Sequence, residues 1–115
     1  FKTVIFSHTD QTPWGRNFLQ NVVKDKDWSI VYIDDFMIVL VKDEGKLPII
    51  DLAKLNPDSY GFNNHVSYLR LGLFLLNNQY FESGRQFIAK TLKLFPDDPI
   101  ANSLIGQPSR NIFFW

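Results

Sequence analysis

Two apolar segments separated by a pair of acidic residues restrict the folds open to this chain more than any other feature. The segments are residues 28–33 and 36–41, with Asp34-Asp35 between them. Val, Ile and aromatic side chains favour strands, and a two-residue connection allows neighbouring strands to pair only in antiparallel fashion. We therefore expect a β-hairpin. Because residues 36–41 are apolar at every position, we expect them to form the central strand, with both faces covered.

A strand and a helix are predicted before this hairpin. Residues 2–7 are rich in β-branched and aromatic side chains and end in a polar segment, which predicts a buried strand. Thr12 and Pro13 have the pattern of an N-cap followed by the first helical residue. An apolar stripe of helical period follows and predicts a helix over residues 13–24. Residues 1–46 therefore predict a strand–helix–hairpin subdomain, a β-α-β-β unit with a three-stranded sheet.

The second half of the chain has the periodicity of helices. Four segments combine an apolar stripe with start or stop signals: residues 47–55, 62–77, 80–95 and 99–105. We assign residues 47–115 to a helical, repeat-like subdomain. The predicted fold class is α+β, a single domain in which a helical hairpin packs against the three-stranded sheet.

Part of the helical half has large and small residues at the spacing of a known repeat. The positions are Tyr68, Leu71, Gly72, Leu75, Phe81, Gly84, Ile88, Thr91 and Pro96. With these residues, the stretch of about residues 64–98 resembles one tetratricopeptide repeat, a pair of antiparallel helices. Gln79 and Thr91 stand where the repeat usually has Gly and Ala. The resemblance implies helices that approach closely at Gly72 and Gly84, and a role in protein–protein interaction.

The N-terminal half carries a second resemblance, through the segments 6–10, 12–14, 18–19 and 28–35. Residues 2–42 are similar to soluble C-terminal regions of bacterial polytopic membrane proteins, including dolichyl-phosphate-mannose-type protein glycosyltransferase-like families. The resemblance implies a domain at the cell membrane through its parent protein, in the soluble phase on the extracytoplasmic side. It also implies that catalytic carboxylates lie elsewhere in the parent. Since Phe1 and not Met is the first residue, we expect a segment of a longer protein.

Composition and motifs argue against several functions. Twelve basic and twelve acidic residues balance, and no basic cluster indicates nucleic acid as a partner. The sequence has no Cys, no Gly-rich phosphate loop and only two His, His8 and His65, which lack the spacing of metal ligands. We therefore expect no cofactor, no metal and no enzymatic activity.

Several polar residues resemble reactive groups but favour structural roles. Ser7, His8 and Asp10 are too close in sequence to assemble readily as a catalytic triad, so we interpret them as turn and cap residues. The pairs Asp34-Asp35 and Asp97-Asp98 fall at predicted turns, where Asp bonds to the local backbone.

The aromatic residues provide the candidate contact sites. Trp14, Trp28 and Tyr32 could stack on a sugar, but each falls on the apolar period of its element, so we predict core packing. We expect the tail 111–115 to fold back onto the domain, as an edge strand for example; contact with a partner or a membrane is the alternative. The candidate partner-binding residues are Asp10, Trp14, Phe113, Phe114 and Trp115.

The favoured function is a non-catalytic accessory or protein-interaction domain of a larger bacterial membrane-associated protein. Its partner would be another protein or the remainder of the parent chain. One alternative is a domain of a membrane glycosyltransferase that contacts the acceptor or a sugar; exposed aromatic rings near Asp10 would favour it. A second alternative is a cytoplasmic tetratricopeptide adaptor, which would require further repeats beyond this segment.

Overall fold

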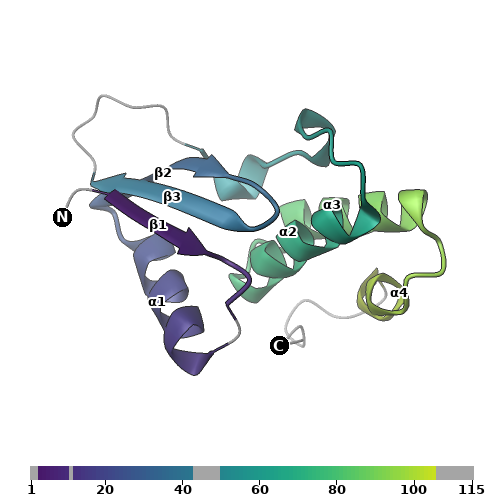
Figure 1. Ribbon diagram of the computed structural model, residues 1–115, viewed down its shortest axis with the longest axis horizontal. Coiled ribbons are helices and arrows are strands. Elements are labelled where there is room, and N and C mark those ends of the chain that lie inside the picture. Colours follow the sequence, from purple (N-terminus) through teal and green to yellow (C-terminus); the bar gives the residue numbers. More distant parts are fainter. Residues whose placement is uncertain (1–2, 11, 43–49, 106–115) are drawn as a thin grey trace. The chain divides into compact units, whose positions relative to one another are not determined.

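The computed structural model describes residues 3–10, 12–42 and 50–105, and the chain divides into two compact units (Figure 1). The first unit comprises residues 1–51 and the second residues 52–115. The described residues contain a three-stranded antiparallel sheet and four α-helices. The α+β mix predicted from the sequence is therefore confirmed. The predicted contact residues 113–115 lie outside the described part of the chain.

The first unit contains the sheet. Its strands are β1 (Thr3–Ser7), β2 (Trp28–Ile33) and β3 (Met37–Lys42), and their order is β1-β3-β2 (Figure 1). Both neighbouring pairs are antiparallel. The central position of β3 is therefore confirmed, although the strand is shifted by one residue from the predicted range. Phe36 belongs to the turn, and its main-chain oxygen accepts a hydrogen bond from the His8 N–H at 2.8 Å.

The two faces of β3 differ in burial. Ile38 and Leu40 are completely buried, whereas the alternate residues Met37, Val39 and Val41 are half-buried. Helix α1 (Pro13–Lys24) explains the first face, because its Phe18 contacts Phe6, the β1 partner of Ile38. Among the described residues the second face is only partly covered, whereas the sequence predicted that both faces are covered.

Helix α1 has the predicted bounds, and its N-terminus has the predicted cap. The Thr12 hydroxyl accepts a hydrogen bond from Gly15 N at 3.0 Å, and Pro13 occupies the first turn. This bond satisfies one of the main-chain donors that a helix start leaves free. Leu19 and Val22 are buried on the inner side of the helix.

A β-bulge in β2 alters the predicted core. Ile30 pairs with Leu40, but Tyr32, two residues later, pairs with Val39, so one extra residue is inserted. The insertion turns Tyr32 to the opposite face from Ile30, and its side chain is 50% exposed. The prediction that Tyr32 packs in the core is therefore wrong. Trp28, at the start of β2, is half-buried.

The segment before the helical hairpin differs from the prediction. No α-helix occurs in the described part of residues 47–55, where Ile50 N bonds to Ile30 O at 2.9 Å. Residues Leu52–Lys54 and Pro57–Ser59 form single 3-10 turns. Within residues 50–55 a single 3-10 turn replaces the predicted helix, because the apolar residues serve two structures: Ile50 extends the edge of the sheet and Leu52 enters the core of the second unit. Residues 47–49 of the predicted helix lie outside the described part of the chain.

The second unit is built on two adjacent helices, α2 (His65–Asn77) and α3 (Phe81–Leu94). Two glycines allow them to approach closely. A Cβ atom at Gly72 would lie 2.9 Å from Ile88 Cδ1, and one at Gly84 would lie 2.7 Å from Leu76 Cδ2. Both distances are shorter than normal packing, so side chains at these positions would push the helices apart.

The turn between α2 and α3 is closed by backbone bonds. Gln79 N donates to Leu76 O at 3.0 Å, and Tyr80 N donates to Leu75 O at 2.8 Å. This is the Schellman pattern, which places one residue in the left-handed conformation. That residue is Gln79, with φ of 69°.

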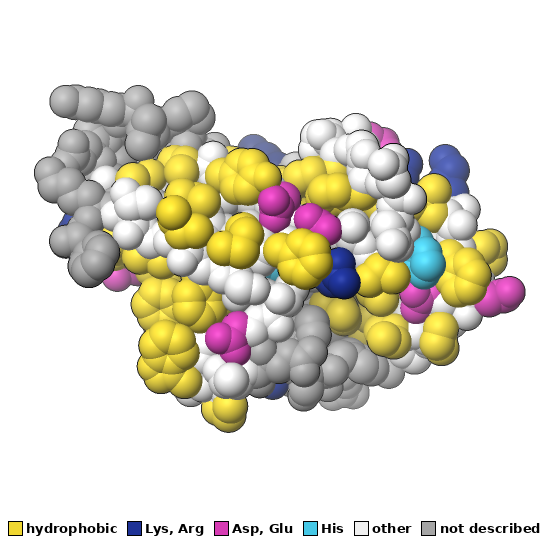
Figure 2. Space-filling model, in the orientation of Figure 1, with side chains coloured by type: hydrophobic (Ala, Val, Ile, Leu, Met, Phe, Trp, Pro, Cys, Tyr) yellow, Lys and Arg dark blue, Asp and Glu magenta, His cyan; other side chains and the backbone are white. Residues whose placement is uncertain are grey.

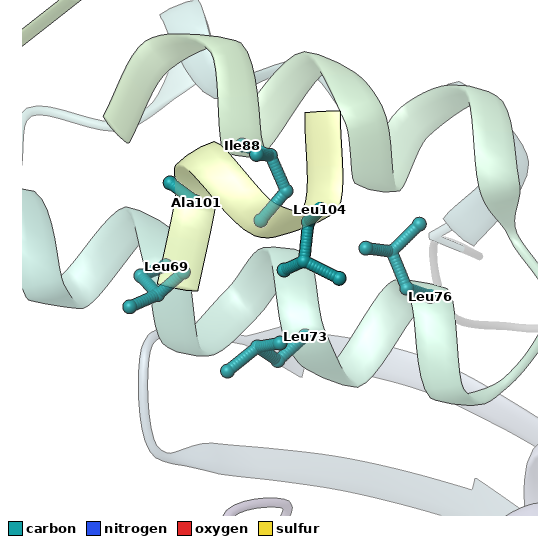
Figure 3. Packing of buried hydrophobic residues seen from close by; sticks show 6 residues of the cluster. All are labelled: Leu69, Leu73, Leu76, Ile88, Ala101 and Leu104. Atoms are coloured by element: carbon teal, nitrogen blue, oxygen red, sulfur yellow. The ribbon is translucent and has the colours of Figure 1, made fainter. Parts of the chain in front are cut away.

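Helix α4 (Pro99–Ile105) completes the described core of the second unit. Its Ala101 and Leu104 are buried against side chains of α2 and α3 (Figure 3). The cluster comprises Leu69, Leu73, Leu76, Ile88, Ala101 and Leu104. The predicted helix over residues 99–105 is confirmed. No helix among the described residues has both the length and the apolar character that crossing a bilayer requires.

Candidate functional site

The segment that joins β1 to α1 holds a carboxylate on the first turn of the helix. Asp10 Oδ1 accepts hydrogen bonds from Thr12 N and from Thr12 Oγ1, both at 2.8 Å. A Cβ atom at Gly15 would lie 2.6 Å from Asp10 Cγ, so only glycine leaves room for the carboxylate there. The bonds from the Thr12 N–H and hydroxyl lower the pKa of Asp10. The site therefore carries a negative charge at neutral pH.

Beside this carboxylate lies an aromatic cluster that consists of Phe6, Trp14 and Phe18. Trp14 stacks on Phe18 with 5.8 Å between ring centroids and 6° between planes, and both rings contact Phe6. Trp14 is nevertheless 68% exposed. The prediction that Trp14 packs in the core is therefore wrong, because its ring lies along the outside of the cluster. Figure 2 shows hydrophobic side chains gathered on this face of the molecule, over α1 and over the sheet.

His8 connects the end of β1 to the β2–β3 turn. Its side chain is buried, and Nε2 lies 2.6 Å from the main-chain oxygen of Asp34. Since a carbonyl oxygen only accepts hydrogen bonds, Nε2 carries a proton and donates it. Burial lowers the pKa of His8, and the bond to Asp34 only partly opposes this effect. A neutral imidazole therefore holds the turn against the end of β1.

The Asp34 carboxylate organises the turn. Oδ1 accepts hydrogen bonds from Phe36 N at 2.9 Å and from Met37 N at 2.7 Å, and Oδ2 accepts one from the Tyr32 hydroxyl at 2.7 Å. Partial burial raises the pKa of Asp34, but the three hydrogen bonds outweigh this effect and lower the pKa. The bond to Asp34 raises the pKa of Tyr32. Asp34 thus has the local backbone role expected of a turn residue.

The three residues that could suggest a catalytic triad bond to different partners. Ser7 Oγ lies 2.9 Å from Thr9 Oγ1, His8 bonds to the Asp34 main chain, and Asp10 accepts from Thr12. These contacts fix the turn between β1 and α1. Within residues 3–10, 12–42 and 50–105, no three His, Asp or Glu side chains are grouped so that they could hold a metal ion.

In the second unit, Asp98 has the role of a helix cap. Its Oδ1 accepts hydrogen bonds from Ile100 N at 2.9 Å and from Ala101 N at 3.0 Å, while its Oδ2 lies 3.8 Å from His65 Nε2. The His65 ring also stacks on Phe95, with 4.6 Å between centroids. Asp98 is buried and Asp97 is exposed. Asp98 therefore caps the start of α4.

The candidate site thus contains two of the five residues predicted from the sequence, Asp10 and Trp14, at one helix start. Phe6 and Phe18 were not among the residues predicted for the site. The spacing of Trp14 and Phe18, four residues apart in a predicted helix, was the signal that their rings would meet. Comparison of this chain with protein-family models, curated proteins and solved structures gives no match.

Proposed function

We propose that this chain is a non-catalytic interaction domain of a larger bacterial membrane-associated protein, and that the aromatic cluster is its contact surface. The observation that carries the proposal is the 68% exposure of Trp14. Keeping an indole in water is unfavourable, and Trp is among the residues most enriched at the centres of protein interfaces. The Trp14 ring packs against Phe6 and Phe18, which restrict its rotation, so binding would cost little side-chain entropy. The partner is another protein or the remainder of the parent chain.

The proposal also includes an interpretation of each of the two units. We interpret the first unit as a β-α-β-β unit and the second as a tetratricopeptide-like hairpin. The close approach of α2 and α3 at Gly72 and Gly84, and the left-handed turn at Gln79, support the repeat interpretation. Membrane association rests on the resemblance of residues 2–42 to domains of membrane proteins, and a non-catalytic role on the structural bonds of Ser7 and Asp10.

A second candidate is favoured by the neighbourhood of Trp14 and Asp10. An exposed aromatic ring beside a carboxylate that stays ionised is suited to a carbohydrate: the ring stacks on the C–H face of a sugar and the carboxylate accepts from its hydroxyls. Asp10 is held beside α1 through Gly15, so the two groups are fixed on one helix turn. This arrangement supports the interpretation of the chain as part of a glycosyltransferase that contacts acceptor or sugar.

A photo-crosslinking experiment tests the main proposal. The photoreactive residue p-benzoylphenylalanine replaces Trp14 in the parent protein, and cells that express it are irradiated. We expect a polypeptide adduct from position 14, either with another protein or within the parent chain. The matched control places the same residue at Phe95, which is 41% exposed and lies outside the aromatic cluster. Equal adducts from both positions, or none from position 14, would overturn the proposal.

The carbohydrate candidate is tested separately by NMR. Mannose oligosaccharides are added to the 15N-labelled chain, and the indole N–H signal of Trp14 is followed. Shifts that saturate and are lost in Asp10→Asn support sugar contact, because the substitution removes the charge and retains the shape. An unchanged spectrum rejects the mannose oligosaccharide as a ligand and leaves the crosslinking result unaffected.

A further inference from the structure

The outer edge of β1 carries main-chain groups that face away from the sheet. His8 N bonds to Phe36 O, and this pair continues the β1–β3 register. Since inward and outward groups alternate along an antiparallel strand, the N–H groups of Thr3, Ile5 and Ser7 point to the outer edge. In the described part of the chain, β1 pairs only with β3. The strand therefore offers a template for one more strand.

The other edge of the sheet is protected, whereas within the described residues this one is not. β2 carries the bulge at Tyr32, and its Ile30 oxygen already accepts from Ile50 N. β1 is regular over its described length and contains no charged residue, Pro or Gly. Its Ile5 side chain is 66% exposed, in a row with Val39 of β3 and Tyr32 of β2. Bulges and charges are the usual devices that prevent edge pairing, and β1 lacks both.

The sequence of β1 is complementary to itself in antiparallel register. With Ile5 on a two-fold axis, Ile5 faces its own copy, Val4 faces Phe6, and Thr3 faces Ser7. Every cross-strand pair is apolar with apolar or hydroxyl with hydroxyl, and such pairs stabilise sheets. In this register Ile5 would exchange both main-chain hydrogen bonds with its copy, and the apolar row would continue from one sheet into the next. No charged side chain of β1 opposes this pairing.

We propose that the outer edge of β1 is a homodimer interface, at which two copies pair antiparallel about Ile5 to form a continuous six-stranded sheet. The partner is a second copy of this chain because the edge is self-complementary at every described position.

Cysteine crosslinking tests the interface directly, because the natural chain has no Cys. Hydrogen-bonded antiparallel partners have Cα atoms about 5.5 Å apart, within the range that a disulfide spans. Under mild oxidation, we expect Ile5→Cys to form a disulfide-linked dimer at least about tenfold faster than Ile100→Cys. Ile100 serves as the control because it is also an exposed Ile, 43% against 66% for Ile5, and lies on α4. Equal crosslinking of the two variants would overturn the proposal.

Sedimentation of the wild-type chain and of Ile5→Lys provides a second readout. The wild type is expected to be dimeric at high concentration. Two ammonium groups placed opposite one another should weaken dimerisation by at least about tenfold, whereas Ile100→Lys should leave it unchanged. Circular dichroism checks that each variant is folded. A monomeric wild type, or a dimer that Ile5→Lys leaves intact, would overturn the proposal.

Discussion

His8 Nε2 lies 2.6 Å from the Asp34 main-chain oxygen, so a buried imidazole joins the end of β1 to the β2–β3 turn. Because burial lowers the pKa of His8 in the folded state, the unfolded chain binds this proton more readily. The contribution of neutral His8 to the free energy of unfolding is therefore fully present above the ordinary His pKa of about 6.5. It decreases as the pH drops below that value.

This pH dependence can be measured by urea unfolding between about pH 7.5 and pH 5. We expect the free energy of unfolding to decrease towards the acid end of this range. In His8→Gln the titrating group is gone and an amide donor remains, so the variant should lose most of the slope. A slope that persists unchanged in His8→Gln would contradict the assignment to His8.

Asp98 and Asp97 form a matched pair for testing the cap of α4. Asp98→Ala removes the acceptor of the Ile100 and Ala101 N–H groups and should cost about 1–2 kcal/mol of unfolding free energy. Asp97→Ala changes an exposed neighbour and should stay within about 0.5 kcal/mol of wild type. Chemical denaturation of the two variants measures the difference. Equal effects would contradict the cap assignment.

Gly84 tests the close approach of α2 and α3. In Gly84→Ala the new methyl group would meet the Leu76 side chain at 2.7 Å and the Leu76 main-chain nitrogen at 3.2 Å. Because the backbone cannot yield as a side chain does, we expect a loss of about 1–3 kcal/mol. Gly61→Ala is the control, since a Cβ there meets nothing within 4 Å. Thermal unfolding should separate the two variants clearly; a Gly84→Ala protein as stable as Gly61→Ala would refute the contact.

At Gln79, in contrast to Gly84, a substitution is expected to stabilise the protein. A non-glycine residue in the left-handed conformation is strained by about 1 kcal/mol, so Gln79→Gly should raise the unfolding free energy by about 0.5–1 kcal/mol. The same change in the interior of α3, Gln86→Gly, should lower it by a similar amount, because Gly is a poor helix former. Two destabilised variants would be inconsistent with the Schellman turn.

Local signals predicted much of the fold. Thr12-Pro13 and the apolar stripe after it gave the bounds of α1, and the continuous apolar run around Ile38 and Leu40 marked the central strand. These signals succeed because caps and periodicity act within one element. Helix α4 was predicted for the same reason, from Asp98-Pro99.

The errors arose where the outcome depends on other elements. The period of β2 placed Tyr32 in the core, but a bulge reversed its direction, and bulges leave little trace in a single sequence. Trp14 has the correct helical phase, yet its ring stacks outside Phe18 and stays exposed. Periodicity identifies the apolar face of a helix, but it does not show which residues of that face the packed part of the chain covers. The Asp10–Gly15 contact likewise follows from the way the chain turns between β1 and α1.

The strand order β1-β3-β2 also has a consequence for how the chain folds. Strand β1 does not pair with β2, the next strand in sequence, but with β3; Phe6 and Ile38 are one such pair. Pairing β1 with β3 closes a long loop that contains α1 and β2. The chain loses conformational entropy in closing this loop before the contacts between the two strands can stabilise the sheet. In the second unit, helices α2 and α3 are joined by a short turn, so their contact closes a much shorter loop. We therefore expect the hairpin of β2 and β3 to form first and the addition of β1 to be the slowest step in completing the sheet.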